Sequence, residues 1–353
     1  MKVMRALTSW RGVLALVIAL FHFHNYPLLA AFGDFRMSFF FMVSGFLLAQ
    51  RYEFREVTRK NYLNFMGRRV LRIYPLHIVA LALFGLGVLL FGGERNVMHE
   101  ALTFLLDALL LQSWSPVRDI YMSHNSVTWF LSSIMFCYLC YPFAVRWLRA
   151  RRLWTQVALL AACLAVVLAV APMLEPGERQ WWVFICPPVR MIDFTAGVVL
   201  FNISERVSRG WVRNVSVAGA TLAEVLALGA IATVTVLQYF GYIDRFAGKP
   251  LKIVFTAMFI LVLVLNNRNK GILSKALSWG PLYWLGQVSY EVYVMQLVVL
   301  NVVRRALATT GLDPDGAVVL VLYLVTLVAV AGVCNKWFGR LSQSLRSRYL
   351  DKP

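Results

Sequence analysis

The chain has 353 residues, of which 60% are hydrophobic and 15% are charged, and its mean hydropathy is +0.67. A soluble domain could not hide so much apolar surface, so the composition indicates an integral membrane protein. The formal net charge of +18 does not indicate nucleic-acid binding. Lys and Arg lie in short clusters between long apolar runs, as they do in the cytoplasmic loops of membrane proteins.

The first apolar run, residues 8–28, follows the basic start MKVMR and resembles a signal peptide. Polar residues end this run and many apolar runs follow, so we expect an uncleaved first membrane span. The span contains Arg11 and His22, and an ionisable residue in hydrocarbon costs roughly 2.5 kcal/mol or more, which favours a functional role. On a helix the two residues are about 16 Å apart along nearly one face. We expect Arg11 at the membrane surface and His22 near mid-depth.

Further apolar runs of about 20 residues predict an all-α, polytopic membrane protein with about ten transmembrane helices. We interpret the chain as a single membrane domain, residues 1–353, with no appended soluble domain. A run of thirteen residues, 101–113, is too short to span and is predicted to be re-entrant or interfacial. The ten spans are expected at about 8–28, 37–52, 70–92, 127–147, 153–173, 183–203, 214–237, 250–267, 282–303 and 317–337.

The distribution of basic residues sets the predicted orientation. With the amino terminus inside, most of the 35 Lys and Arg fall in cytoplasmic segments, as the positive-inside rule requires. Counting 101–113 as a span would place the basic cluster at 146–152 outside. Both termini are therefore predicted to be cytoplasmic.

Several ionisable residues lie inside predicted spans. Arg190 and Asp193 are three positions apart, so they can form a structural ion pair on one helical face. Glu224 and Glu291 have no partner that the sequence identifies. The five cysteines all lie in apolar segments, so neither a disulfide framework nor a metal site is supported.

The third span opens with RRVLRIYP, in which Arg69 and Arg72 project from one face. Guanidinium groups suit phosphate oxygens, but taken alone this pair is an ordinary positive-inside anchor. Likewise, Ser44 and Gly45 in FFFMVSGF could form a small-residue packing seam.

Taken in order, six segments resemble acyltransferase family 3, a family of membrane-bound acyltransferases. These segments are RGVLALVIALFH, SFFFMVSGFLLA, RRVLRIYPLH, WFLSSIMFCYLCYP, RMIDFTAG and LGQVSYEVYVMQ, and they cover most of the chain. Members add acetyl or related groups to O-antigens, exopolysaccharides, peptidoglycan, antibiotics and other acceptors. The family also implies ten spans with both termini inside.

The resemblance implies catalytic roles for His22 and Arg11, and it places Arg69 and Arg72 with Arg11 as the groups that hold the CoA phosphates. It carries the SGF turn onto Ser44, Gly45 and Phe46. The candidates for contact with the substrate or with the oxyanion are Ser44, Gly45, His24 and Trp129.

Two positions depart from the family pattern. Many members have a glutamate where this chain has Ile134, and many have a histidine where it has Gln296. Since His22 and the arginines remain, we expect altered acceptor specificity. No hydrolase-like domain follows the last span, so transfer is expected to finish within the membrane domain.

The resemblance implies an O-acyltransferase of the bacterial cytoplasmic (inner) membrane, which moves an acetyl or similar short acyl group from cytoplasmic acetyl-CoA to a glycan hydroxyl. His22 would be a general base or a transient acyl carrier. The expected partners are the lipid bilayer, acyl-CoA and a glycan or lipid-linked glycan, with possible self-association or assembly into a polysaccharide machine. Two alternatives stay open: a transporter or flippase of an anionic or lipid-linked sugar, and an inactive scaffold.

Overall fold

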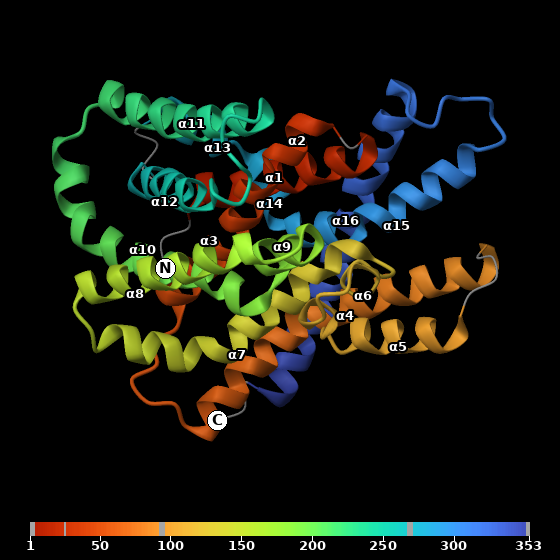
Figure 1. Cartoon of the computed structure of the whole chain (residues 1–353), viewed down its shortest axis with the longest axis horizontal. Coiled ribbons are helices and arrows are strands. Elements are labelled where there is room, and N and C mark those ends of the chain that lie inside the picture. The colour runs from red at the N-terminus through yellow and green to blue at the C-terminus, as the bar shows by residue number, and fades with distance from the viewer. Residues whose placement is uncertain (1–3, 25, 92–95, 267–270, 351–353) are drawn as a thin grey trace.

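The structure is a computed structural model that describes residues 4–24, 26–91, 96–266 and 271–350, without the side chains of residues 208–214. These residues form helices and no β-strand (Figure 1). The α-helices are α1 Arg5–His24, α2 Pro27–Ala31, α3 Gly33–Arg51, α4 Arg59–Phe91, α5 Val97–Ala108, α6 Arg118–Tyr121, α7 Trp129–Arg149, α8 Leu153–Val170, α9 Pro176–Gln180, α10 Pro187–Asn214, α11 Val217–Tyr239, α12 Lys249–Leu265, α13 Ile272–Leu277, α14 Gly280–Gln287, α15 Ser289–Leu307 and α16 Ala317–Tyr349. Short 3₁₀ segments lie at Gln112–Trp114, Ser126–Thr128 and Ala171–Met173, and a π-helical turn lies at Trp181–Ile185.

The protein is an all-α, polytopic membrane protein, as predicted. Within the described residues, eight helical stretches are long and apolar enough to cross a membrane. The other two predicted spans are also helical. However, α12 has only 17 residues, and α15 carries Glu291, Arg304 and Arg305. The count of ten spans and the cytoplasmic placement of both termini remain predictions.

Two predicted segments differ in detail from the structure. The span expected at 282–303 is interrupted at Val288, which separates α14 from α15. The interruption follows Gly286, where the backbone of α14 touches that of α1. The short segment expected at 101–113 contains the last eight residues of α5, a turn and the start of a 3₁₀ segment. Helix α5 itself has 12 residues and packs beside α4 (Figure 1). This helix is too short to span a bilayer, as predicted.

Local sequence sets several helix boundaries. Asn96 caps α5 by accepting a hydrogen bond from the His99 backbone N–H at 3.2 Å, and Ser216 caps α11 through the Gly219 N–H at 3.1 Å. Glu224 accepts hydrogen bonds from the N–H groups of Leu273 and Ser274 in the first turn of α13. Glu224 therefore stabilises the start of a helix, which explains a carboxylate that had no partner readable from sequence.

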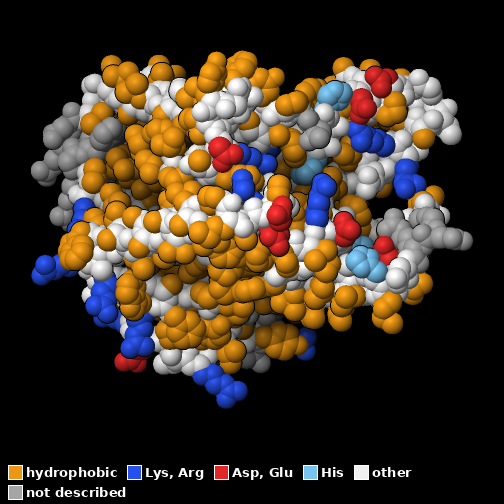
Figure 2. All heavy atoms as spheres, in the orientation of Figure 1, with side chains coloured by type: hydrophobic (Ala, Val, Ile, Leu, Met, Phe, Trp, Pro, Cys, Tyr) orange, Lys and Arg blue, Asp and Glu red, His pale blue; other side chains and the backbone are white. Residues whose placement is uncertain are grey.

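The helices α1 and α3 lie at the centre of the molecule, because both contribute side chains to its two main hydrophobic clusters. One cluster joins them to α4, α7, α15 and α16, and the other joins them to α11 and α12. Outer helices expose large apolar side chains, among them Trp154, Leu226 and Val325. Figure 2 shows hydrophobic side chains covering much of one face, with a group of Lys and Arg along its left edge. A hydrophobic surface of this kind suits a lipid solvent.

Candidate functional site

The position of Arg11 is fixed by a backbone contact beside it. A Cβ atom on Gly12 would lie 2.6 Å from the Gly286 nitrogen, and a Cβ on Gly286 would lie 2.0 Å from the Thr8 carbonyl oxygen. Only glycine allows two helices to approach this closely. The contact holds α14 against α1 at the level of Arg11.

Arg11 and Arg72 lie close enough to repel each other, and Glu291 attracts both. The distance from Arg72 Nη1 to Glu291 Oε1 is 3.3 Å, and the Glu291 side chain is only 1% exposed. Asn335 of α16 donates a hydrogen bond to the same carboxylate oxygen at 3.0 Å. Arg11 of α1 and Arg72 of α4 therefore meet at the buried carboxylate of Glu291 in α15.

Tyr138 of α7 lies near both Arg69 and Arg11 and interacts with Ser44 of α3. Arg69 donates a hydrogen bond to the Tyr52 hydroxyl at 3.0 Å, and its guanidinium carbon is 5.9 Å from the centroid of the Tyr138 ring. The structure thus brings together the three predicted donor-binding arginines, which come from α1 and α4.

Arg346, near the end of α16, is a functional candidate that sequence reasoning missed. It lies near Arg69 and Arg72 and donates to the Arg68 carbonyl oxygen at 3.3 Å. In the sequence it belongs to an ordinary basic tail, and no motif marks it. We call Arg11, Arg69, Arg72 and Arg346 the arginine cluster. Within the described part of the chain, Glu291 is the carboxylate that interacts with the arginine cluster.

A pocket of about 330 Å³ opens beside the cluster, where α3 ends and α4 begins. It is lined by Arg51, Tyr52, Glu53, Phe54, Asn61, Asn64, Phe65 and Arg68. Tyr52 is therefore both a wall of this pocket and the hydrogen-bond partner of Arg69. Arginines with aromatic rings can hold a phosphate and stack on a flat base.

His22 lies in the last turn of α1, and its placement near mid-depth of the membrane remains a prediction. It lies near Arg36, which is buried and donates to the carbonyl oxygens of Val17 and Leu29 at 3.1 and 2.7 Å. Within the described part of the chain, no hydrogen-bond partner occupies the His22 ring nitrogens. His24 is exposed and packs on Tyr26, with 4.5 Å between ring centroids.

The SGF segment is helical and is not the expected turn. Ser44 and Gly45 lie in the middle of α3, where backbone N–H groups make helical hydrogen bonds and are not free to bind an oxyanion. A Cβ on Gly45 would lie 2.0 Å from the Phe194 carbonyl oxygen, so this glycine forms a packing seam between α3 and α10. The Ser44 hydroxyl donates to the Phe40 carbonyl oxygen at 2.8 Å.

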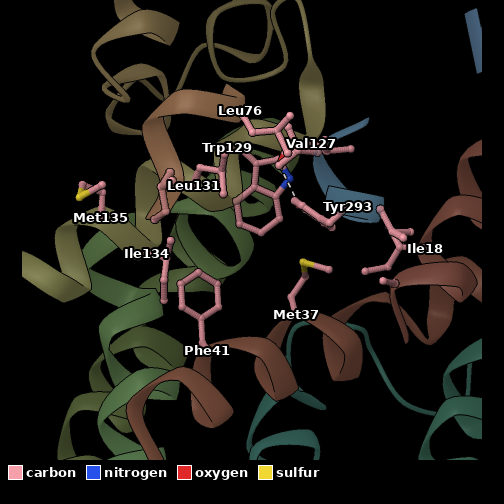
Figure 3. Close-up of a cluster of buried hydrophobic side chains, with 14 of the residues drawn as sticks. Ile18, Met37, Phe41, Leu76, Val127, Trp129, Leu131, Ile134, Met135 and Tyr293 are labelled. Carbon is pink, nitrogen blue, oxygen red and sulfur yellow. Dashed lines mark hydrogen bonds between the residues drawn. The ribbon is translucent and has the colours of Figure 1, made fainter. Parts of the chain in front are cut away.

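The two positions that depart from the family pattern are both buried. Ile134 is 2% exposed and lies near Phe41, in the same cluster as Trp129 (Figure 3). Gln296 is fully buried; its Nε2 donates to the Tyr293 carbonyl oxygen at 2.8 Å, while its Oε1 has no partner among the described atoms. Trp129 begins α7, and its ring lies 5.1 Å from that of Phe184.

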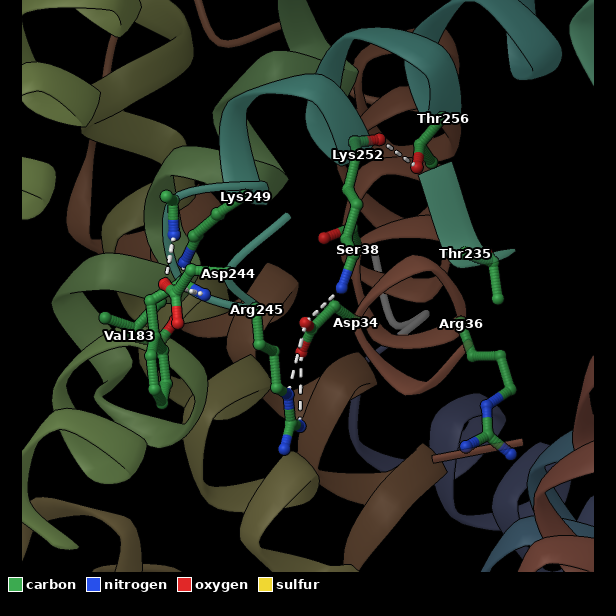
Figure 4. A network of polar contacts seen from close by, with 12 residues as sticks. Asp34, Arg36, Ser38, Val183, Thr235, Asp244, Arg245, Lys249, Lys252 and Thr256 are labelled. Atoms are coloured by element: carbon green, nitrogen blue, oxygen red, sulfur yellow. Dashed lines mark hydrogen bonds and ion pairs between the residues drawn. The ribbon is translucent and has the colours of Figure 1, made fainter. Parts of the chain in front are cut away.

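Arg190 and Asp193 form the predicted ion pair, with 2.6 Å between Nη1 and Oδ2 and both side chains buried. Asp34, Lys249 and Lys252 line a small space together with Arg190. Figure 4 shows the contacts that these three residues make with their other neighbours. Asp34 pairs with Lys252 and with Arg245, and Lys249 Nζ donates to the Val183 carbonyl oxygen at 2.6 Å. These contacts join the start of α12 to the start of α3 and to the π-helical turn that precedes α10.

Comparison with known proteins agrees with this arrangement. A family model described as "Acyltransferase domain" matches residues 4–336. The chain belongs to acyltransferase family 3. The curated relative "Acyltransferase MdmB" from Streptomyces mycarofaciens is 28% identical over 337 residues, which cover 87% of this chain and 82% of the relative. No solved structure matches significantly. The chain is therefore a membrane acyltransferase, and the arginine cluster is the candidate active-site feature of this family member.

Proposed function

We propose that this acyltransferase moves an acetyl or similar short acyl group from cytoplasmic acyl-CoA to a hydroxyl of a cell-envelope or exported glycan. The arginine cluster is the observation that carries the proposal. Three guanidinium groups from α1 and α4 lie near Tyr138 or Glu291, and that of Arg346 in α16 lies near Arg69 and Arg72. An excess of buried or half-buried positive charge favours a polyanionic ligand, and the phosphates of CoA supply one.

The donor would bind with its phosphates on the arginine cluster and its adenine base in the aromatic pocket beside Tyr52. The extended pantetheine arm would then follow α1 toward His22, a rise of about 16 Å from Arg11. This geometry requires the donor to enter from the predicted cytoplasmic end.

His22 would act as general base. The acceptor oxygen attacks the thioester carbonyl carbon while a free ring nitrogen of His22 takes the hydroxyl proton. The carbon–sulfur bond then breaks, and the CoA thiolate receives that proton from the imidazolium. Arg36, whose side chain lies near His22, stabilises negative charge that develops on the carbonyl oxygen.

The test is acyl-CoA-dependent acetylation by membranes that contain equal amounts of each variant. His22→Ala should lower the rate by about 10²–10⁴-fold, because it removes the base. Arg11→Ala should mainly weaken CoA binding, which can be measured separately on purified protein. Arg340→Ala removes an exposed arginine of α16 outside the cluster and should change neither quantity. Wild-type activity in His22→Ala or Arg11→Ala would refute the assignment.

The acceptor can be identified by mass spectrometry of envelope glycans from a deletion strain. A lost acetyl mass increment would name the reaction and the acceptor together. Transport of a sugar without consumption of acyl-CoA would instead favour a carrier, and absence of CoA binding would favour a scaffold.

A further inference from the structure

The small space among the buried charges of Figure 4 is a cavity at the start of α12, beside α3 and α10. None of the residues that form its walls belongs to the arginine cluster. Three of the four charged residues in the walls are basic, so we call this space the cationic cavity. Its walls are formed by Asp34, Ser38, Val183, Phe184, Arg190, Phe246, Lys249 and Lys252.

Four cations lie at the cationic cavity. Lys249 and Lys252 are three positions apart on one face of α12, and both are 4% exposed. Arg190 of α10 is 1% exposed and lies near both lysines. Arg245 lies near Lys252 and contacts Asp34, with 3.4 Å between Arg245 Nε and Asp34 Oδ2. Positive charges that are gathered this closely repel one another unless anions neutralise them.

Two carboxylates neutralise part of this charge. Asp34 pairs with Lys252 and Arg245, and Asp193 pairs with Arg190. Of the residues whose side chains the structure describes, none gives Lys249 an ion-pair partner, and its ammonium group donates to the Val183 carbonyl oxygen at 2.6 Å. An ammonium group has three N–H donors. The site therefore has a formal excess of two positive charges and further donors for a ligand.

An excess of buried charge is costly, because burial removes the water that would solvate it. Either the loss of a proton from a lysine or the binding of an anion reduces this excess. The placement of the cations favours an anion. Lys249, Lys252 and Arg190 come from two helices and line one cavity, so that charged donors from both helices can hold the same ion.

The volume of the cationic cavity selects a very small anion. The cavity measures about 10 Å³, and a single water-sized particle needs on the order of 10–15 Å³. A carboxylate, phosphate or sulfate group has several oxygen atoms and does not fit. Chloride is a single atom slightly larger than water, and flexible lysine side chains can move apart by the small distance it needs. Arg245 is 38% exposed, so it provides a route for the ion from the surface.

We propose that the cationic cavity is a chloride-binding site, in which Lys249, Lys252 and Arg190 hold one ion. The ion removes one of the two excess charges and joins the start of α12 to α10. Chloride therefore stabilises the folded chain. The proposal does not depend on the proposed acyl transfer, because it concerns other residues and another ligand.

The experiment measures chloride binding by the purified full chain in dodecyl maltoside. The protein is transferred to sodium gluconate, and chloride then replaces gluconate at constant ionic strength. Binding of radiolabelled chloride and the melting temperature are measured on the same samples. We expect saturable binding and a rise in melting temperature. Chloride at about one hundred times its Kd should raise the ratio of folded to unfolded protein by about 100-fold. Bromide should replace chloride, whereas gluconate and sulfate should not.

Lys249→Met tests whether the cationic cavity is the site that binds the ion. This variant removes one charged donor and should weaken chloride binding by at least about tenfold. Lys275→Met is the matched control, because it makes the same substitution at an exposed position of α13 and should bind like wild type. The arginine cluster also attracts anions, so only the binding that is lost in Lys249→Met is assigned to the cationic cavity. If Lys249→Met fails to fold, Lys249→Gln, which keeps a hydrogen-bond donor, decides.

Loss of the chloride response in the Lys249 variant and its retention in Lys275→Met would confirm the proposal. Three results would overturn it. Absence of saturable binding would indicate that a lysine loses its proton instead. Equal binding by wild type and the Lys249 variant would place the ion elsewhere. Equal stabilisation by chloride, gluconate and sulfate would reduce the effect to ionic strength.

Discussion

Gly286→Ala tests whether the seam between α1 and α14 positions Arg11. The new Cβ would lie 2.0 Å from the Thr8 carbonyl oxygen, whereas real Cβ atoms essentially never come closer than 3.0 Å. The atoms it meets belong to the backbone, so no side-chain rotation relieves the overlap. Helix α1 must move away by at least about 1 Å, at a cost of roughly 1–3 kcal/mol for overpacking.

This displacement should affect activity more than stability. Arg11 lies three positions after Thr8, so the shift moves it relative to Arg72 and to the donor. A misplacement of about 1 Å can cost about 10²-fold in rate. We therefore expect Gly286→Ala to lower acyl-CoA-dependent acetylation by one to two orders of magnitude, together with a measurable loss of thermal stability in detergent.

The matched control is Gly229→Ala, on the exposed face of α11, where a Cβ would meet nothing within 4 Å. Alanine has the higher helix propensity, so this variant should gain about 0.5–1 kcal/mol and keep wild-type activity. Both measurements use the same membranes and the same detergent extract. If Gly286→Ala behaves like Gly229→Ala in both assays, the seam does not position Arg11.

Three further predictions concern buried positions. Asp34→Asn leaves Lys252 buried without its carboxylate and should destabilise the protein by about 3–5 kcal/mol. The double variant Asp34→Asn, Lys252→Met should recover most of the lost melting temperature. Losses that simply add in the double variant would contradict the coupling of the two residues. Ile134→Glu places a charge at a site that is 2% exposed, so the variant should give no peak of folded protein on size-exclusion chromatography. A well-folded variant would show that a partner for the new carboxylate is present. Burial raises the pKa of the Asp107 carboxyl group, so the folded protein keeps this group protonated to a higher pH than the unfolded chain does. The contribution of Asp107 to the free energy of unfolding therefore falls as the pH rises above about 4, where the unfolded carboxyl group loses its proton. Asp107→Asn should flatten that part of the curve of melting temperature against pH, and an unchanged slope would refute the cause.

The fold class and the shared helical face of Arg69 and Arg72 could be predicted because their signals are local. Apolar runs of span length mark helices, and the spacing of Arg69 and Arg72 puts both on one face. That α1 brings Arg11 to the same place depends on the Gly12–Gly286 contact, which joins positions far apart in the chain. Arg346 was missed for the same reason, because only the packing of α16 against α4 brings it there.

The burial of several cations could not be predicted from sequence. Arg36, Lys249 and Lys252 lie close to the ends of predicted spans, and all three are at most 4% exposed. Asp34 neutralises Lys252 from a position 218 residues away, a pairing that sequence spacing does not reveal. The turn that the resemblance implies for the SGF segment is wrong, and the alternative of a packing seam is confirmed at Gly45; a glycine suits a turn and a close helix crossing equally well.

The two glycine seams also bear on how the molecule can move. At Gly45 and Gly286, backbone meets backbone, and such contacts resist sliding. Helix α4 has no such contact at its own glycines: a Cβ on Gly67 would meet only the Leu350 side chain, and one on Gly87 would meet nothing. Side chains can repack where backbones cannot. Movement at α4, the helix that carries Arg69 and Arg72, therefore meets less resistance from backbone contacts than movement at the two seams.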